Sequence, residues 1–84
     1  MKDNKLILKV LTPEGAVFEG AVEAVFLPGT KGRFEVLPGH APIISSLDAG
    51  SVTWRSEGKE SEVSIKTGAL ILDKNELKLC VQTV

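Results

Sequence analysis

The residues able to do chemistry in this 84-residue sequence are few and scattered. One histidine, His40, and one cysteine, Cys80, are present, so neither a second imidazole nor a second thiol exists to complete a metal site. No serine, histidine and acidic residue stand at a spacing that indicates a nucleophilic triad. Glu60 and Glu62 flank Ser61 on a strand face that we expect to be solvated, which is poor support for an acid/base pair of carboxylates. We therefore expect no catalytic residue, no metal and no cofactor.

For one further segment and two single residues, a structural interpretation outweighs a chemical one. Gly29-Thr30-Lys31-Gly32 resembles a phosphate loop only faintly, because the Walker spacing and a following helix are missing, and we predict a turn. Trp54 alternates onto an apolar strand face, which favours packing over ligand binding. Cys80 falls on the polar face of the last strand with Lys78 as its one basic neighbour, which favours an inert thiol.

The unusual segment runs from Val36 to Ile44 and contains Pro38-Gly39-His40-Ala41-Pro42. Two prolines four residues apart restrict the backbone to a stiff, non-helical bend. Apolar residues enter and leave this bend, and such a loop is costly to show to water. The residue types alone leave two alternatives open: the loop is tucked into the core, or another protein covers it.

The elements that position these residues follow a period of two, which indicates strands with one buried face. The alternating apolar sets are Leu6, Leu8, Val10; Phe34, Val36; Val52, Trp54; Val63, Ile65; and Leu77, Leu79, Val81. Short turn signals separate them, at residues 13–15, 28–29, 31–32, 38–39, 48–50, 57–58 and 73–75. No window shows helical spacing. We predict an all-β fold, a sandwich or a barrel with antiparallel pairing through hairpins, formed by a single domain over residues 1–84. Residues 22–27, apolar on both faces except for Glu23, predict a central strand or one that meets a partner.

Composition narrows the function classes further. A net charge of −1 with interspersed signs gives no electrostatic footprint for nucleic acid or an anionic membrane. A single cysteine excludes an internal disulfide, as a reducing compartment would require. The polar residues 1–5 and the short apolar run at 6–8 do not form a signal peptide, and no stretch approaches a membrane span. Membrane association is therefore expected only through a partner.

The segment Pro38-Gly39-His40-Ala41-Pro42 resembles the PGHAP signature of the epsilon subunit of F-type ATP synthases. The resemblance extends through Leu11–Gly20, Val22–Gly32, Gly50–Thr53 and Lys66–Leu70, and so covers nearly the whole chain in order. It implies a two-sheet antiparallel β-sandwich of about ten short strands that acts as a non-catalytic rotor subunit in the central stalk. In the family, that subunit binds the gamma subunit, contacts the membrane c-ring and helps to couple proton-driven rotation to ATP synthesis. The implied location is the cytoplasmic face of the bacterial plasma membrane, peripheral, within the complex.

By positional match, the resemblance implies two contact sites. The gamma-facing residues would be Val17, Phe18, His40, Ala41, Pro42 and Ile44. The c-ring-facing loop would be Gly29, Thr30, Lys31, Gly32 and Arg33.

The sequence departs from the family pattern in two places, and each limits the roles that the resemblance implies for this chain. Many members have an acidic residue where this chain has Arg33, so no specific salt bridge with the ring is carried over. The sequence stops at Val84, before the C-terminal helical hairpin that restrains ATP hydrolysis in many members. We therefore expect this polypeptide to supply neither that brake nor the nucleotide site that some relatives form there.

Two binding modules and an enzyme are the alternatives to a rotor subunit. A free-standing adhesion or carbohydrate-binding sandwich would display several aromatic residues, and this chain has only three phenylalanines, one tryptophan and no tyrosine. A small nucleic-acid-binding barrel would need a basic, aromatic face. An enzyme ranks last, because no reactive set of residues is present.

Overall fold

The structure of the chain is a computed structural model that describes residues 5–84. Of the polar N-terminal segment, residues 1–4 lie outside the described residues. The strands are β1 (Leu6–Thr12), β2 (Gly15–Val22), β3 (Ala24–Gly29), β4 (Gly32–Val36), β5 (Ile43–Leu47), β6 (Gly50–Ser56), β7 (Lys59–Asp73) and β8 (Glu76–Thr83). Residues 5–84 contain no helix, and hence none long and apolar enough to cross a membrane.

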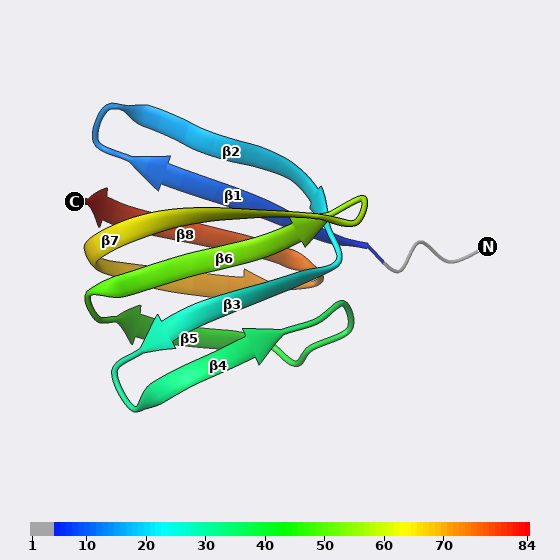
Figure 1. The fold of residues 1–84 in the computed structure, drawn as a ribbon. Helices are drawn as coiled ribbons and strands as arrows, with labels where there is room; N and C mark the ends of the chain where they lie inside the picture. The colour runs from blue at the N-terminus through cyan, green and yellow to red at the C-terminus, as the bar shows by residue number, and fades with distance from the viewer. Residues whose placement is uncertain (1–4) are drawn as a thin grey trace.

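The strands form two layers that share one long strand (Figure 1). One layer has the order β2-β1-β8-β7-β5, and the other has the order β7-β6-β3-β4. The 15-residue β7 pairs with β6 through its first half and with β5 and β8 through its second half. A register shift between Ile65 and Thr67 marks the corner where β7 passes from one layer to the other. A Cβ on Gly68 would lie 2.7 Å from the Val81 Cγ1, so the close approach of β8 at this corner needs glycine.

The all-β sandwich is confirmed, with two corrections to the expected strands. There are eight strands rather than about ten, because β7 turns the corner through a bulge without breaking. One pairing, β1 with β8, is parallel, so the sheet is not wholly antiparallel.

Two local predictions were also wrong. The strand expected over residues 22–27 breaks at Glu23, where the chain leaves β2 in one layer and enters β3 in the other. Pro28-Gly29 is the end of β3 rather than a turn, and the turn residues are Thr30 and Lys31 between the paired Gly29 and Gly32.

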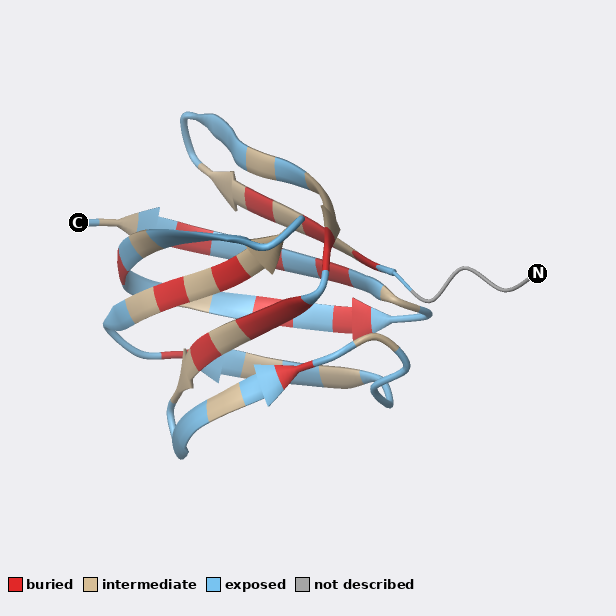
Figure 2. Ribbon diagram, turned by 45° about the vertical axis from the view of Figure 1, so that its right-hand side comes forward, coloured by how far each residue is buried: buried red, intermediate tan, exposed pale blue. Residues whose placement is uncertain are grey.

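The core lies between the layers and contains most of the residues that the period-two pattern placed there, although Phe34 and Val63 are only partly buried against it. Figure 2 shows buried residues alternating with intermediate ones along β6 and with exposed ones along β8. The buried side chains include Leu6, Leu8, Val10, Val52, Trp54, Ile65, Leu77, Leu79 and Val81. The alternation therefore separates an inner face from an outer face on each layer, and any contact surface must use the outer faces or the loops.

Candidate interaction surface

Two isoleucines stand out on the outer face of the β2-β1-β8-β7-β5 layer. Ile44 of β5 is 81% exposed and Ile71 of β7 is 51% exposed, and they are direct partners in the ladder between the two strands. Their neighbours Leu70 and Leu72 are buried, so strand alternation turns Ile71 outward. Together they form a small exposed apolar patch, which makes this face a candidate for contact with a second protein.

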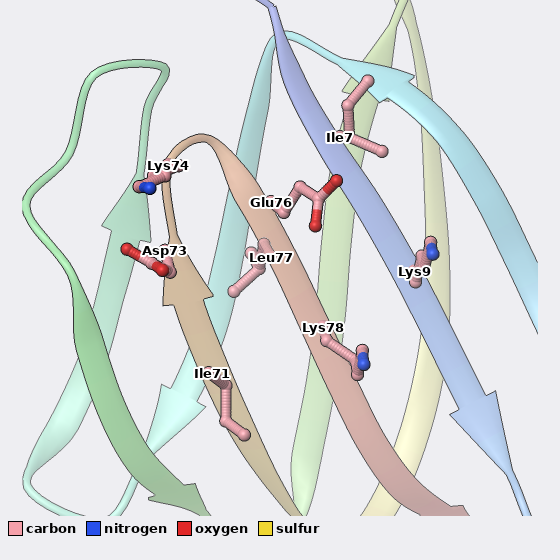
Figure 3. A pocket seen from close by; sticks show the side chains of 8 residues that line it. All are labelled: Ile7, Lys9, Ile71, Asp73, Lys74, Glu76, Leu77 and Lys78. Atoms are coloured by element: carbon pink, nitrogen blue, oxygen red, sulfur yellow. The ribbon is translucent and has the colours of Figure 1, made fainter.

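The surface around this pair is hollowed. A groove of about 440 Å³ is lined by Pro42, Ile43, Ile44, Ile71, Leu72 and Asp73. A second hollow of about 330 Å³ continues over β7, β8 and β1, and Figure 3 shows the side chains that line it: Ile7, Lys9, Ile71, Asp73, Lys74, Glu76, Leu77 and Lys78. The two hollows share Ile71 and Asp73, so the apolar pair is bordered by charged groups of both signs.

The double-proline loop between β4 and β5 leads directly into this patch. His40, Ala41 and Pro42 are exposed, which decides the question that the residue types left open: the loop is not tucked into the core. The His40 N–H donates to the Leu37 carbonyl at 3.1 Å across Pro38 and Gly39, and Gly39 has φ of +87°. This arrangement is a β-turn with proline first and a left-handed glycine second.

The ring of His40 is oriented by its own loop. Its Nδ1 lies 2.7 Å from the Ala41 carbonyl oxygen, and since that oxygen can only accept, Nδ1 carries the proton. In the neutral ring this leaves Nε2 as a hydrogen-bond acceptor.

Val17 and Phe18 are neighbours in β2 but face opposite sides of the layer. Val17 is 48% exposed on the outer face, whereas Phe18 is half-buried against the core. The Phe18 ring centroid lies 4.9 Å from that of Trp54, with the planes tilted by 41°. Phe18 therefore closes the edge of the core, and Val17 is four strands away from Ile44 on the same outer face.

The loop expected to face a ring lies at the other end of the sandwich from the double-proline loop (Figure 1). Thr30 and Lys31 are exposed at its tip. The Arg33 side chain returns across the outer face of the second layer, where its guanidinium donates to the Ser51 carbonyl at 2.8 Å and to the Thr53 hydroxyl at 3.3 Å. The charge at the tip thus comes from Lys31, while Arg33 ties β4 to β6.

Chemistry-bearing groups do not converge anywhere in residues 5–84. Within this range no three histidine, cysteine or acidic side chains gather as metal ligands. Cys80 is exposed on the outer face, as its alternation predicts. The four aromatic residues are all buried or half-buried, which leaves no exposed aromatic platform for a sugar ring.

Ile71 is the member of the surface that the sequence reasoning missed. A signal was present, because residues 69–72 are apolar at outward as well as inward positions. The same departure from alternation at residues 22–27 has a different cause, the crossing between layers at Glu23.

A family model described as the ATP synthase, Delta/Epsilon chain, beta-sandwich domain matches residues 5–84. The chain is 44% identical over 69 residues to the ATP synthase epsilon chain of Wolinella succinogenes, covering 81% of this chain and 53% of the relative. It is 38% identical over 79 residues to the ATP synthase epsilon chain of Campylobacter fetus subsp. fetus, covering 93% and 61%. The chain thus spans only about half to three fifths of the length of these relatives.

Solved structures share the fold at low sequence identity. A chain in the cryo-EM structure of Euglena gracilis mitochondrial ATP synthase, OSCP/F1/c-ring in rotational state 1, matches with a TM-score of 0.89 at 19% identity, covering 96% of this chain and 52% of that one. A chain in the cryo-EM structure of the central stalk/c-ring of Tetrahymena thermophila mitochondrial ATP synthase matches with a TM-score of 0.79 at 12% identity, covering 98% and 66%. These two likenesses confirm the sandwich fold.

Proposed function

The chain belongs to the family of the ATP synthase Delta/Epsilon chain beta-sandwich domain, and from this premise we propose that it is a non-catalytic rotor element of the central stalk of an F-type ATP synthase. The observation that carries the proposal within the molecule is the exposed Ile44–Ile71 pair beside the double-proline loop. A chain with this family membership and no converging reactive groups in residues 5–84 would act by binding other subunits. No cofactor or small-molecule substrate enters the proposal.

The gamma subunit is the proposed partner of the outer face of the β2-β1-β8-β7-β5 layer. The contacting residues would be Val17, His40, Ala41, Pro42 and Ile44, with Ile71 added. Burying Ile44 and Ile71 contributes up to about 1.5–3 kcal/mol for each side chain taken fully out of water. Phe18 would support this contact from behind, because its ring holds β2 against Trp54.

The c-ring is the proposed partner of the turn at residues 29–33. Thr30 and Lys31 stand at the tip, so Lys31 would offer a cation to polar or acidic groups on the ring loops. Gamma-facing and ring-facing loops at opposite ends would make the sandwich a spacer between the two partners. A closely packed interior suits a spacer under rotational load because it resists compression.

In this role the domain would turn with gamma and the ring, and so help to couple proton flow to ATP synthesis in the catalytic head. Its place would be the cytoplasmic face of the bacterial plasma membrane, held there peripherally by the complex.

The test is co-purification with the gamma subunit from the same genome, followed by size-exclusion chromatography. We expect a stable one-to-one complex with the wild-type chain and loss of the complex with Ile44→Asp, whose site is 81% exposed and therefore tolerates the change in the isolated domain. Phe18→Asp should also lose the complex, together with stability. Glycan binding without a gamma complex would overturn the proposal in favour of an adhesion or carbohydrate-binding module.

A further inference from the structure

The double-proline loop, residues 37–42, has few ties to the rest of the molecule. Pro38 and Pro42 have no backbone N–H to donate, and the turn bond from His40 to Leu37 stays within the loop. In the part of the chain that the structure describes, one hydrogen bond joins this loop to a distant element: the Gly39 N–H donates to the Asn75 Oδ1 at 2.7 Å, across 36 residues of sequence. The conformation of the loop relative to the sandwich thus depends strongly on Asn75.

Asn75 is itself held firmly. With Lys74 it forms the two-residue turn between β7 and β8, and both have positive φ, +51° for Lys74 and +63° for Asn75. These angles fit the turn that suits the twist of a hairpin, and asparagine tolerates the left-handed region better than most residues. The Asn75 carbonyl accepts the Ile7 N–H at 2.8 Å, which ties the turn to β1 as well. The Asn75 side-chain oxygen therefore projects from a backbone that is held both by the β7–β8 turn and by β1.

The turn and the loop lie side by side at the same end of the sandwich, next to the hollowed patch (Figures 1 and 3). Asp73, one residue before the turn, lines both hollows, and Pro42, the last loop residue, lines the groove with Ile44 and Ile71. Fixing the loop through Gly39 thus fixes where Pro42 and His40 stand relative to the apolar pair.

We propose that Asn75 is a positioning residue for partner binding: its carboxamide oxygen holds the double-proline loop in the shape that the partner recognises. This inference rests on the proposed function, in which that partner is gamma. A loop ordered before binding loses less conformational entropy on docking than a loose one, so the anchor favours the complex without touching the partner.

The test uses two substitutions that distinguish the effect of the Asn75 carboxamide from the effect of the left-handed backbone at that position. Asn75→Gly suits the left-handed turn position at least as well as asparagine but removes the carboxamide. Asn75→Asp keeps an oxygen acceptor for Gly39. Amide hydrogen exchange at Gly39 measures the anchor, titration calorimetry with gamma measures binding, and urea unfolding measures stability.

We expect Asn75→Gly to leave stability unchanged or raised, to speed Gly39 exchange about tenfold or more, and to weaken gamma binding about tenfold. Asn75→Asp should restore both readouts to within a few-fold of wild type. A role in the turn alone predicts instead that Asn75→Gly binds gamma as wild type does, and that result would overturn the inference. Equal Gly39 exchange in wild type and Asn75→Gly would overturn it as well.

Failure of the proposed function gives a different result. If the wild-type chain binds no gamma while Gly39 exchange still responds to Asn75→Gly, the loop anchor stands, and both the rotor role and the assignment of Asn75 to partner binding are overturned.

Discussion

The two outer faces of the sandwich arise from the same alternating pattern, but they differ in whether their side chains find partners within the chain. On the β6-β3-β4 side, Arg33 donates to β6, and Arg55 lies 3.2 Å from the Glu23 carboxylate and 4.0 Å from that of Glu60. On the β5-β7-β8 side, Ile44 and Ile71 face outward without an apolar cover. The charged groups of the first face pair within the chain, whereas the second face leaves apolar side chains uncovered, and this difference is why we propose the second face as the binding surface.

The largest effect should come from placing the same charge on each face in turn. Ile71→Asp should weaken gamma binding about 100-fold, or about 2.7 kcal/mol, because an apolar contact is replaced by a carboxylate that must lose water. Ser64→Asp, on an exposed position of the other layer, should change the affinity less than about twofold. Titration calorimetry of both variants measures the contrast. Equal losses would mean that the apolar face is not the gamma surface.

A second comparison uses two neighbours that point to opposite sides of β2. Phe18→Ala should lower the free energy of unfolding by about 2 kcal/mol, less than a fully buried phenylalanine, because the ring is half-buried against Trp54. Val17→Ala should change it by no more than about 0.5 kcal/mol, since its side chain already meets water. Urea denaturation gives both values. Similar losses in the two variants would contradict the assignment of Phe18 to the inner side.

The smallest effect concerns the two cations of the turn at residues 29–33. Arg33→Met should cost about 0.5–1 kcal/mol of stability through the loss of its bonds to Ser51 and Thr53. Lys31→Met should be neutral in the isolated domain, because its exposed side chain stands at the tip. The same denaturation assay compares them, and a larger loss for Lys31→Met would reverse the roles given to the two residues.

The sequence predicted the parts of the fold that depend on side-chain alternation. Leu6, Leu8, Val52, Trp54, Leu77 and Leu79 are buried because a period of two on a strand has only two possible faces. Features that depend on distant contacts were not predictable in the same way. The continuity of β7 requires Gly68 to pass close to Val81, and the parallel pairing of β1 with β8 joins strands far apart in sequence.

The candidate surface was predictable in part for the same reason. The stiffness of the double-proline loop follows from its residue types, but its exposure depends on how it sits against the β7–β8 turn. The opposite facing of Val17 and Phe18 follows from alternation, whereas the contact of Phe18 with Trp54 depends on how the two layers meet. The hydrogen bond from Gly39 to Asn75 joins two turns that lie 36 residues apart in the sequence, and no local sequence pattern indicates such a bond.

The parallel pairing of β1 with β8 also bears on how the chain is made. As the polypeptide leaves the ribosome, β1 can form a hairpin with β2 at once, but its other edge stays open until residues 76–80 have emerged. The ladder on that edge must therefore wait for β8, and ladders between such distant segments form slowly compared with local hairpins. Until β8 has formed, the backbone groups on that edge of β1 lack their ladder partners, and an unpaired strand edge is a template for pairing with another chain.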